Sequence, residues 1–314
     1  MKRKVIQIAE STQLVSLPRK WALKYGVKKG DEVDVLEEGN KIVVSTGVED
    51  EKKSKIDINI TDLDKDSLIF LLRALFIRQY DEISLRFDRA ITKHHRVGDT
   101  VRFLSVIHGE ISRSIGFEII QQRGNSVIIK RITASSMKEF EGMLRRIFLL
   151  ILDAVQDLQQ GLANLDYDLL ESLEEKHDSV TKFIVYTLGI LNTHGYTNYK
   201  DTPFLFHIIY SLDTIIDILR DTSRRIISEK IIPSKDSAAI FDEIKKAMNL
   251  FYELFYHFSL KKAEEFSGSR DRILLLIKRT ARKLTKEDLR VLIATEQCVE
   301  ILRDMSSARM AMEY

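Results

Sequence analysis

The chain has 314 residues, enough for two or three domains, and its 44% hydrophobic content excludes wholesale disorder. It contains only 3 prolines and 13 glycines, while 31% of its residues are charged, a balance typical of long helices. Its single cysteine, Cys298, excludes an internal disulfide and fits a reducing cytoplasm. The longest apolar run, IFLLIL at 147–152, is far shorter than the about 18 residues of a bilayer span, so we expect a cytoplasmic protein without membrane insertion.

The formal net charge is only +2, but the basic residues are concentrated at the start of the chain. Residues 1–30 contain eight Lys or Arg residues and a single acid, Glu10. A local excess of basic residues of this kind can favour contact with the phosphate backbone of a nucleic acid.

Residues 1–46 form a small unit built on strands. KVIQIA alternates between apolar and polar residues, and DEVDVLEEGNKIVVS contains two such runs around a turn, which predicts a hairpin. Between them, LPRKWALKYG predicts a short helix that starts at Pro18 and stops at Gly26. So short a segment buries little by itself, so we expect it to pair with a second copy of the chain.

Residues 47–55 are polar and predict a linker, and residues 56–132 predict a small α+β domain without an assigned role. Its elements are strand IDINI, a helix from about Asp64 to Tyr80, strand EISLRF, a helix near 99–112 and the hairpin GFEIIQQ–SVIIKRI. His94 and His95 fall in the basic stretch TKHHRVGD, where we expect solvated loop histidines. The domain could be a spacer, a ligand-binding sheet or a second dimer contact.

The remainder is helical, in two sets of three. We expect a first set of helices near 136–163, 167–194 and 201–230. A second set is expected near 235–266, 269–283 and 285–312, with breaks at SGS and then at KLTKED. This order predicts a duplicated three-helix unit over 136–230 and 235–312. The fold class is therefore multidomain and mainly α.

Pairs of acids four residues apart lie outside the apolar stripes of three of these helices. Asp213 and Asp217 lie about 100° and about 140° from the apolar centre of their helix, and Glu174 and Asp178 share these offsets on the preceding one. One such pair is usually a solvated face, and we assign Asp221 to ordinary surface. Four converging carboxylates are costly without a cation, and oxygen ligands suit Mg²⁺, Ca²⁺, Mn²⁺ or iron.

Enzymatic chemistry has little support in the sequence. His177 follows Glu174 by three residues, as in di-iron bundles, but no second Glu-x-x-His faces it, which favours a half-buried structural histidine. Neither a serine nucleophile elbow nor a phosphate-binding glycine loop occurs. We therefore expect a protein that is not an enzyme.

The N-terminal residues resemble a SpoVT/AbrB-type module, in SLPRKWA followed by GVKKGDEV and a closing strand. The resemblance implies a swapped-hairpin homodimer that grips DNA with basic side chains. By position the candidates are Lys2, Arg3, Lys4, Arg19, Lys20 and Lys24. The alternative is a pure dimerisation module with solvated lysines.

The helical half resembles PhoU-type phosphate-signalling proteins, in LEEKHDSV, LDTIIDILRDTSRRI and ATEQCVEILRDMSSARM. The resemblance implies two tandem three-helix bundles, each with a surface cluster for iron, manganese or zinc-like cations. By position the first cluster is Glu174, Asp178, Asp213 and Asp217, and the second is Asp271, Glu300 and Asp304. The chain departs from the family at Ser267, where a fourth acid is expected, and at His177, which replaces an apolar residue.

The leading hypothesis is a non-enzymatic regulator of phosphate uptake that binds DNA as a homodimer or higher homo-oligomer. The resemblance further implies contact with the phosphate ABC transporter. A second hypothesis is an AbrB-type transcription regulator unrelated to phosphate, whose helical half senses another ligand or oligomerises. A third is a di-iron metalloenzyme.

Overall fold

A computed structural model describes the whole chain except residues 1, 9–11, 39–40, 47–53 and 233. It divides into two compact units, Met1–Lys53 and Ser54–Tyr314, which are described separately below. The structure is 62% helical, as expected for a mainly α protein.

The N-terminal unit consists of two hairpins and a short helix. β1 (Ile6–Ile8) pairs with β2 (Thr12–Leu14), and β3 (Asp34–Glu38) pairs with β4 (Lys41–Ser45), both antiparallel. α1 (Arg19–Lys24) follows Pro18, as the sequence predicts. No residue of this unit with a described burial is buried, and its large apolar side chains are exposed, among them Val5, Ile6, Ile8, Val15, Leu23, Val35 and Ile42. One copy of this unit therefore forms no hydrophobic core among its described residues.

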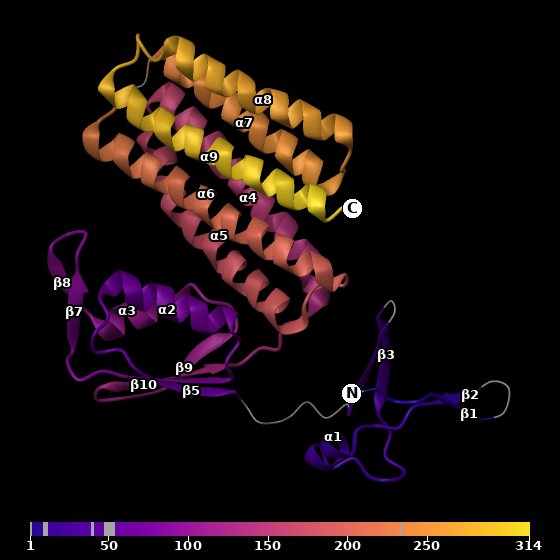
Figure 1. Ribbon diagram of the computed structural model, residues 1–314. Helices are drawn as coiled ribbons and strands as arrows, with labels where there is room; N and C mark the ends of the chain where they lie inside the picture. The colour runs from indigo at the N-terminus through magenta and orange to yellow at the C-terminus, as the bar shows by residue number, and fades with distance from the viewer. Residues whose placement is uncertain (1, 9–11, 39–40, 47–53, 233) are drawn as a thin grey trace. The chain divides into compact units, whose positions relative to one another are not determined.

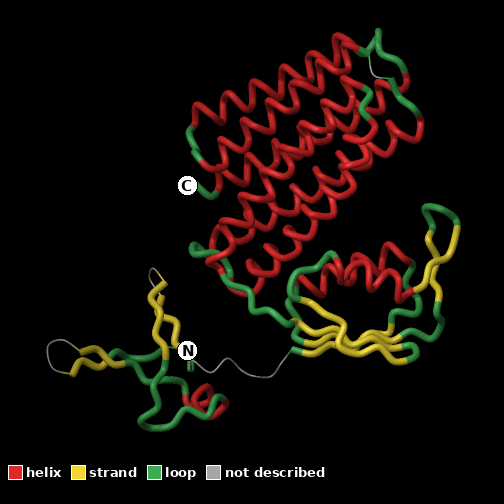
Figure 2. Tube along the Cα trace, turned by 180° about the vertical axis from the view of Figure 1, so that it is seen from behind, coloured by secondary structure: helices red, strands yellow, loops and turns green. Residues whose placement is uncertain are grey.

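The second unit begins with a four-stranded sheet in the order β5-β6-β10-β9. β5 (Lys55–Asn59) runs parallel to β6 (Glu82–Arg86), and β10 (Ser126–Arg131) is antiparallel to both β6 and β9 (Phe117–Arg123). α2 (Lys65–Ile77) and α3 (Phe103–Ser112) cover one face of the sheet (Figure 2). Alternate residues of β6 and β10 point under these helices and are fully buried: Ile83, Leu85, Val127 and Ile129.

Two predictions for this region are wrong. The helix expected near 99–112 begins only at Phe103, because Asp99–Arg102 forms strand β8, which pairs with β7 (Ile91–His94). The stretch TKHHRVGD therefore belongs to a hairpin: His94 lies half-buried in β7, whereas His95 is exposed in the turn, as expected for a loop histidine. Cross-strand pairing at Thr92 and Val101, both β-branched, favours strands over the helical spacing of the local sequence.

The rest of this unit is a bundle of six helices (Figure 1). α4 (Met137–Asn164), α5 (Tyr167–His194) and α6 (Thr202–Glu229) pack together, and so do α7 (Lys235–Tyr256), α8 (Leu260–Thr280) and α9 (Lys286–Ala311). The two sets meet where α4 packs on α7 and α6 packs on α9. Helix α2 lies against α5 and so attaches the sheet to the bundle.

The boundary between α7 and α8 differs from the prediction. The helix expected over 235–266 ends at Tyr256, and the next begins after Ser259, whose side chain accepts a hydrogen bond from the Lys262 backbone N–H. The sequence SGS, expected as a break, lies inside α8, where Ser269 is fully buried. Packing of small side chains against neighbouring helices overrides their weak helix propensity here.

Residues 199–229, which include α6, form a segment that is long and apolar enough to cross a membrane by length and composition alone. In the structure, the apolar stripe of α6 is buried in the bundle, with Leu212, Ile215 and Ile216 fully inaccessible. The core helices of soluble bundles are commonly both long and apolar, so the segment is weak evidence for a membrane span.

Candidate functional site

The six basic residues that the sequence singles out for DNA binding lie on exposed parts of the N-terminal unit. Lys2, Arg3 and Lys4 precede β1, and Arg19, Lys20 and Lys24 lie on α1. Lys24 donates to the hydroxyl of Tyr25 over 3.0 Å, and its ammonium lies 4.8 Å from the centre of that ring. The helix thus presents cations of the kind that contact phosphate groups.

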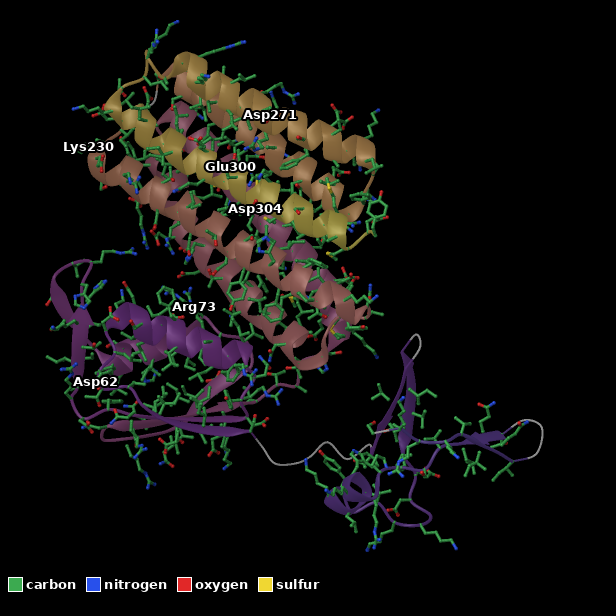
Figure 3. All side chains as sticks on the ribbon, viewed as in Figure 1. Asp62, Arg73, Lys230, Asp271, Glu300 and Asp304 are labelled. Carbon is green, nitrogen blue, oxygen red and sulfur yellow. The ribbon has the colours of Figure 1, made fainter. Side chains whose placement is uncertain are left out.

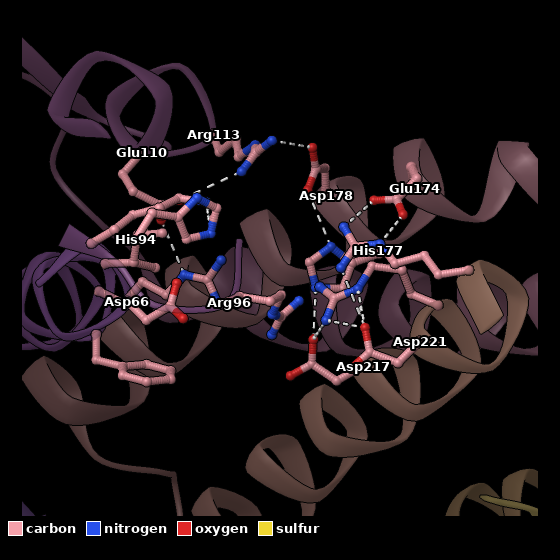
Figure 4. Close-up of a pocket in the computed structure, with 16 residues that line it drawn as sticks. Asp66, His94, Arg96, Glu110, Arg113, Glu174, His177, Asp178, Asp217 and Asp221 are labelled. Carbon is pink, nitrogen blue, oxygen red and sulfur yellow. Dashed lines mark hydrogen bonds and ion pairs between the residues drawn. The ribbon is translucent and has the colours of Figure 1, made fainter. Parts of the chain in front are cut away.

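Three of the four acids of the first predicted cluster line one cavity of about 290 Å³ (Figure 4). Glu174 and Asp178 come from α5 and Asp217 comes from α6, where spacing by four residues places each pair on one helix face. Asp213 does not line the cavity, and its Oδ1 accepts a hydrogen bond of 3.1 Å from the Thr181 hydroxyl. The predicted convergence of α5 and α6 therefore occurs, but without Asp213 in the cavity.

The opposite wall of the cavity comes from the α+β part of the same unit. Helix α2, strand β7 and helix α3 contribute its basic residues, which are Lys65, Arg73, His94 and Arg113, and Arg96 follows β7 in the turn of the hairpin. Figure 3 shows Arg73 on the face of α2 that is turned toward the bundle. The sequence assigned no role to this part of the chain, and the structure shows that it forms half of the cavity.

Arginine side chains neutralise the carboxylates on the bundle side. Arg224 binds both oxygens of Glu174, with 2.7 Å between Nη2 and Oε2. Arg220 lies 2.9 Å from Asp217 and 3.0 Å from Asp221. Asp221, which the sequence assigned to ordinary surface, therefore belongs to the cavity.

Asp178 is neutralised from the other wall. Nη2 of Arg113, at the end of α3, lies 2.8 Å from its Oδ2. Burial raises the pKa of Asp178, but its bonds to His177 and Arg113 lower the pKa more, so this carboxyl ionises more readily than usual.

His177 is central to this arrangement, although its Glu-x-x-His spacing lacked a second such step in the sequence and favoured a half-buried structural histidine. It is 3% exposed, with Nδ1 3.1 Å from Asp178 and Nε2 2.9 Å from Asp217. Burial lowers the pKa of His177, but these carboxylates raise it more and leave it above its ordinary value despite Arg220, 2.5 Å from Nε2. The Glu-x-x-His spacing was the available signal, and its partners on α6 became visible only in three dimensions.

The pKa values of Asp213 and Asp217 are shifted in opposite directions, although both residues lie on α6. The pKa of Asp213 is raised, first by burial and then by repulsion from Asp217. The pKa of Asp217 is lowered, because His177 and Arg220 outweigh the effect of burial. Asp217 is therefore the ionised member of the pair at lower pH.

The second predicted cluster lies on α8 and α9 (Figure 3). Arg270 links Asp271 and Glu300, at 2.9 Å and 2.6 Å, and Arg303 links Glu300 and Asp304, at 3.2 Å each. The spacing Glu300–Arg303–Asp304 repeats that of Asp217–Arg220–Asp221 on α6. Both clusters are thus carboxylates bridged by arginine.

These donor sets do not fit a metal ion as they stand. Within the part of the chain that the structure describes, no group of three or more His, Cys, Asp or Glu side chains is arranged to hold one. A cation in the first cluster would have to displace the guanidinium of Arg224 or Arg113 from its carboxylate. Metal binding stays a prediction of the sequence.

Comparison with known proteins identifies the N-terminal unit. Residues 6–56 match the family model described as antidote-toxin recognition MazE, a bacterial antitoxin. This match confirms a MazE/AbrB-type domain at the start of the chain. No curated protein and no solved structure matches the chain. The likeness of the helical half to PhoU-type proteins stays a prediction.

Proposed function

We propose that this protein is a homodimeric, DNA-binding transcription regulator, without enzymatic activity, whose Ser54–Tyr314 unit receives the signal that controls DNA binding. The observation that carries the proposal is the MazE-type match over residues 6–56. MazE/AbrB-type domains bind DNA and are commonly oligomeric. A domain of this type also suggests action in the cytoplasm.

The burial pattern of the N-terminal unit supports a dimer. Its apolar side chains are exposed in a single copy, with Ile6 59% and Ile42 68% accessible. Alternating strands of this kind gain stability when a second copy covers them, and swapped hairpins are one way to do so. The exposed basic residues of α1 and of the segment before β1 would then occur twice, as two half-sites in DNA require.

A gel-shift titration with the chain's own promoter, at several salt concentrations, tests this function. We expect binding that weakens steeply as salt rises, because cations on the protein replace counterions of the DNA. Sedimentation analysis of the same sample should give a dimer. A monomer with no salt-sensitive binding at low ionic strength would refute the proposal.

We further propose that the regulated process is phosphate uptake. Support comes from the two sets of three long helices and from the acid-rich segments that resemble PhoU-type proteins. Docking on the phosphate ABC transporter and cation binding at the acidic clusters belong to this proposal. Transcript levels of phosphate-transport genes, compared between wild type and deletion strains during phosphate starvation, test it. Unchanged levels would favour a regulator that responds to a different signal.

A further inference from the structure

We infer that the cavity between α2, the β7–β8 hairpin, α5 and α6 is a binding site for a small oxyanion that carries a phosphate group. The inference goes beyond the proposed function, since it names the ligand of the Ser54–Tyr314 unit. The cavity, at about 290 Å³, has the size of the smaller ligand pockets in proteins.

Arginine already neutralises most acids of the cavity in this structure. Each one except Asp66 takes part in an ion pair with arginine; these are Glu110, Glu174, Asp178, Asp217 and Asp221. Asp66 lies in the first turn of α2, beside Lys65, where the helix N-terminus favours a negative charge.

Unpaired cations lie on the α+β wall. Lys65 and Arg96 line the cavity, and neither makes an ion pair with another described residue. Nζ of Lys65 lies 3.2 Å from Nε2 of His94, two groups that both carry a positive charge when protonated. Figure 4 shows Arg96 extending into the space between the two walls. Among the described residues, Lys65 and Arg96 therefore lack an anionic partner, although Asp66 and Glu110 lie on the same wall.

A phosphate group can serve as the anionic partner of Lys65 and Arg96. Its oxygens accept several hydrogen bonds at once, and the planar guanidinium of arginine matches two of them. Arg220 and Arg224 approach the same cavity from α6, but each is bound to carboxylates there, so Lys65 and Arg96 supply the cations that are free to hold an anion. Phe70, 68% exposed, adds an aromatic surface against which an organic group of a phosphomonoester could pack.

Such a ligand would contact both the α+β part and the bundle. Among the described residues, one ion pair, Arg113–Asp178, joins the α+β part to the bundle. An oxyanion between the walls would add further charged contacts there and so strengthen the contact between the α+β part and the bundle.

The test is calorimetric titration of the full chain with inorganic phosphate, sulfate and adenosine monophosphate, each at millimolar concentration and constant ionic strength. We compare the wild type with Lys65→Ala/Arg96→Ala and with Lys93→Ala/Arg102→Ala. The second variant is the matched control, since it removes the same charge from the same hairpin region outside the cavity. Thermal unfolding verifies that both variants fold.

We expect the wild type and the control to bind, and the cavity variant to bind about tenfold more weakly or worse. Phe70→Ala separates the sources: weaker binding of adenosine monophosphate alone indicates a phosphomonoester, and no change indicates the free anion. Absence of binding by all three anions, or equal affinity of the two double variants, overturns the inference. Oxyanion binding without DNA binding would refute only the proposed function, and DNA binding without oxyanion binding only this inference.

Discussion

Arg113 at the end of α3 and Asp178 in the middle of α5 form an ion pair with 2.8 Å between Nη2 and Oδ2. The two residues are 65 positions apart in the sequence (178 − 113), and the pair joins the sheet region to the helical bundle. Their side chains are 47% and 32% exposed, so water screens the attraction. The pair therefore orients the two parts more than it stabilises the chain.

We expect Arg113→Ala to cost less than about 1 kcal/mol of unfolding free energy, the usual limit for an exposed pair. Amide exchange in α3 and the facing part of α5 should nevertheless accelerate, because the contact between them loosens. Urea denaturation and hydrogen-exchange mass spectrometry measure the two effects. Arg86→Ala, which breaks a more exposed pair with Asp57 within the sheet, is the control and should leave α5 unchanged.

Gly189→Ala should destabilise the contact between α2 and α5. A methyl group at Gly189 would lie 2.4 Å from Nε2 of Gln79, a buried side chain that donates 2.8 Å to the Phe76 carbonyl. We expect a loss of about 1–3 kcal/mol, typical of overpacking, measured by urea denaturation.

Two further variants test whether the clash with Gln79 causes the loss of stability in Gly189→Ala. Gly142→Ala on α4 meets nothing within 4 Å and should stabilise the chain by about 0.5–1 kcal/mol. Gln79→Gly in the Gly189→Ala background should recover part of the loss, since Gln79 has a φ of 56° that glycine adopts without strain. A Gly189→Ala chain as stable as the wild type would show that Gln79 moves aside at no cost.

Asp288 should make stability depend on acid pH. The carboxylate is buried, accepts hydrogen bonds from the backbone of Ser234 and Thr285 at 2.9 Å and 3.1 Å, and completes the capping box of α9. Burial raises the pKa of Asp288, but these hydrogen bonds lower it more, so it lies below its ordinary value. The unfolded chain therefore takes up this proton at a higher pH than the folded chain.

It follows that the stabilisation is complete above the unfolded pKa of about 3.9 and is lost as the pH falls through the folded value. Asp288→Asn should cost about 0.5–2 kcal/mol at neutral pH, as for other helix caps. The difference in unfolding free energy between the wild type and Asp288→Asn should shrink as the pH falls below about 4. Urea denaturation at several pH values measures this difference. A constant difference would show that Asp288 titrates normally.

The metal prediction can be decided by elemental analysis. A cation that binds the first cluster must displace arginine from its carboxylates, so we expect little manganese or iron in the purified wild-type chain and less in Asp213→Ala/Asp217→Ala. Arg224→Ala should raise it, since the guanidinium competes with a cation for Glu174. Equal content in all three proteins would show that ion pairs alone hold the acids.

Basic residues of the N-terminal unit should set the salt dependence of DNA binding. Arg19→Ala/Lys20→Ala should reduce the slope of log K against log salt by about 0.9 for each phosphate contact that is lost. Lys28→Ala/Lys29→Ala removes two other exposed lysines of the same unit and serves as the control. Identical slopes for both variants and the wild type would exclude α1 from the DNA contact.

Features that depend on neighbours in the chain could be predicted from the amino-acid sequence. The ends of α5 could be predicted because Asp166 caps its first turn and Gly195, with a φ of 67°, follows its last residue. The hairpin of β9 and β10 and the N-terminal unit with its basic helix carry similarly local signals. Helix periodicity placed Glu174 and Asp178 on one helix face and Asp213 and Asp217 on another, but their convergence also required that α5 and α6 be neighbours.

The surroundings of those acids depend on contacts between distant parts of the chain and could not be predicted from the sequence. Arg113 and Arg96 reach the cavity from segments that carry no periodic relation to α5, and Arg224 lies 50 residues after Glu174. The sequence analysis also missed the β7–β8 hairpin and the break between α7 and α8, where strand pairing and the Ser259 cap prevailed over helical spacing. Local propensities differ by fractions of a kcal/mol per residue, whereas burial of one large side chain contributes about 1.5–3 kcal/mol. Long-range packing therefore selected the partners of each carboxylate, and with them the chemistry of the cavity.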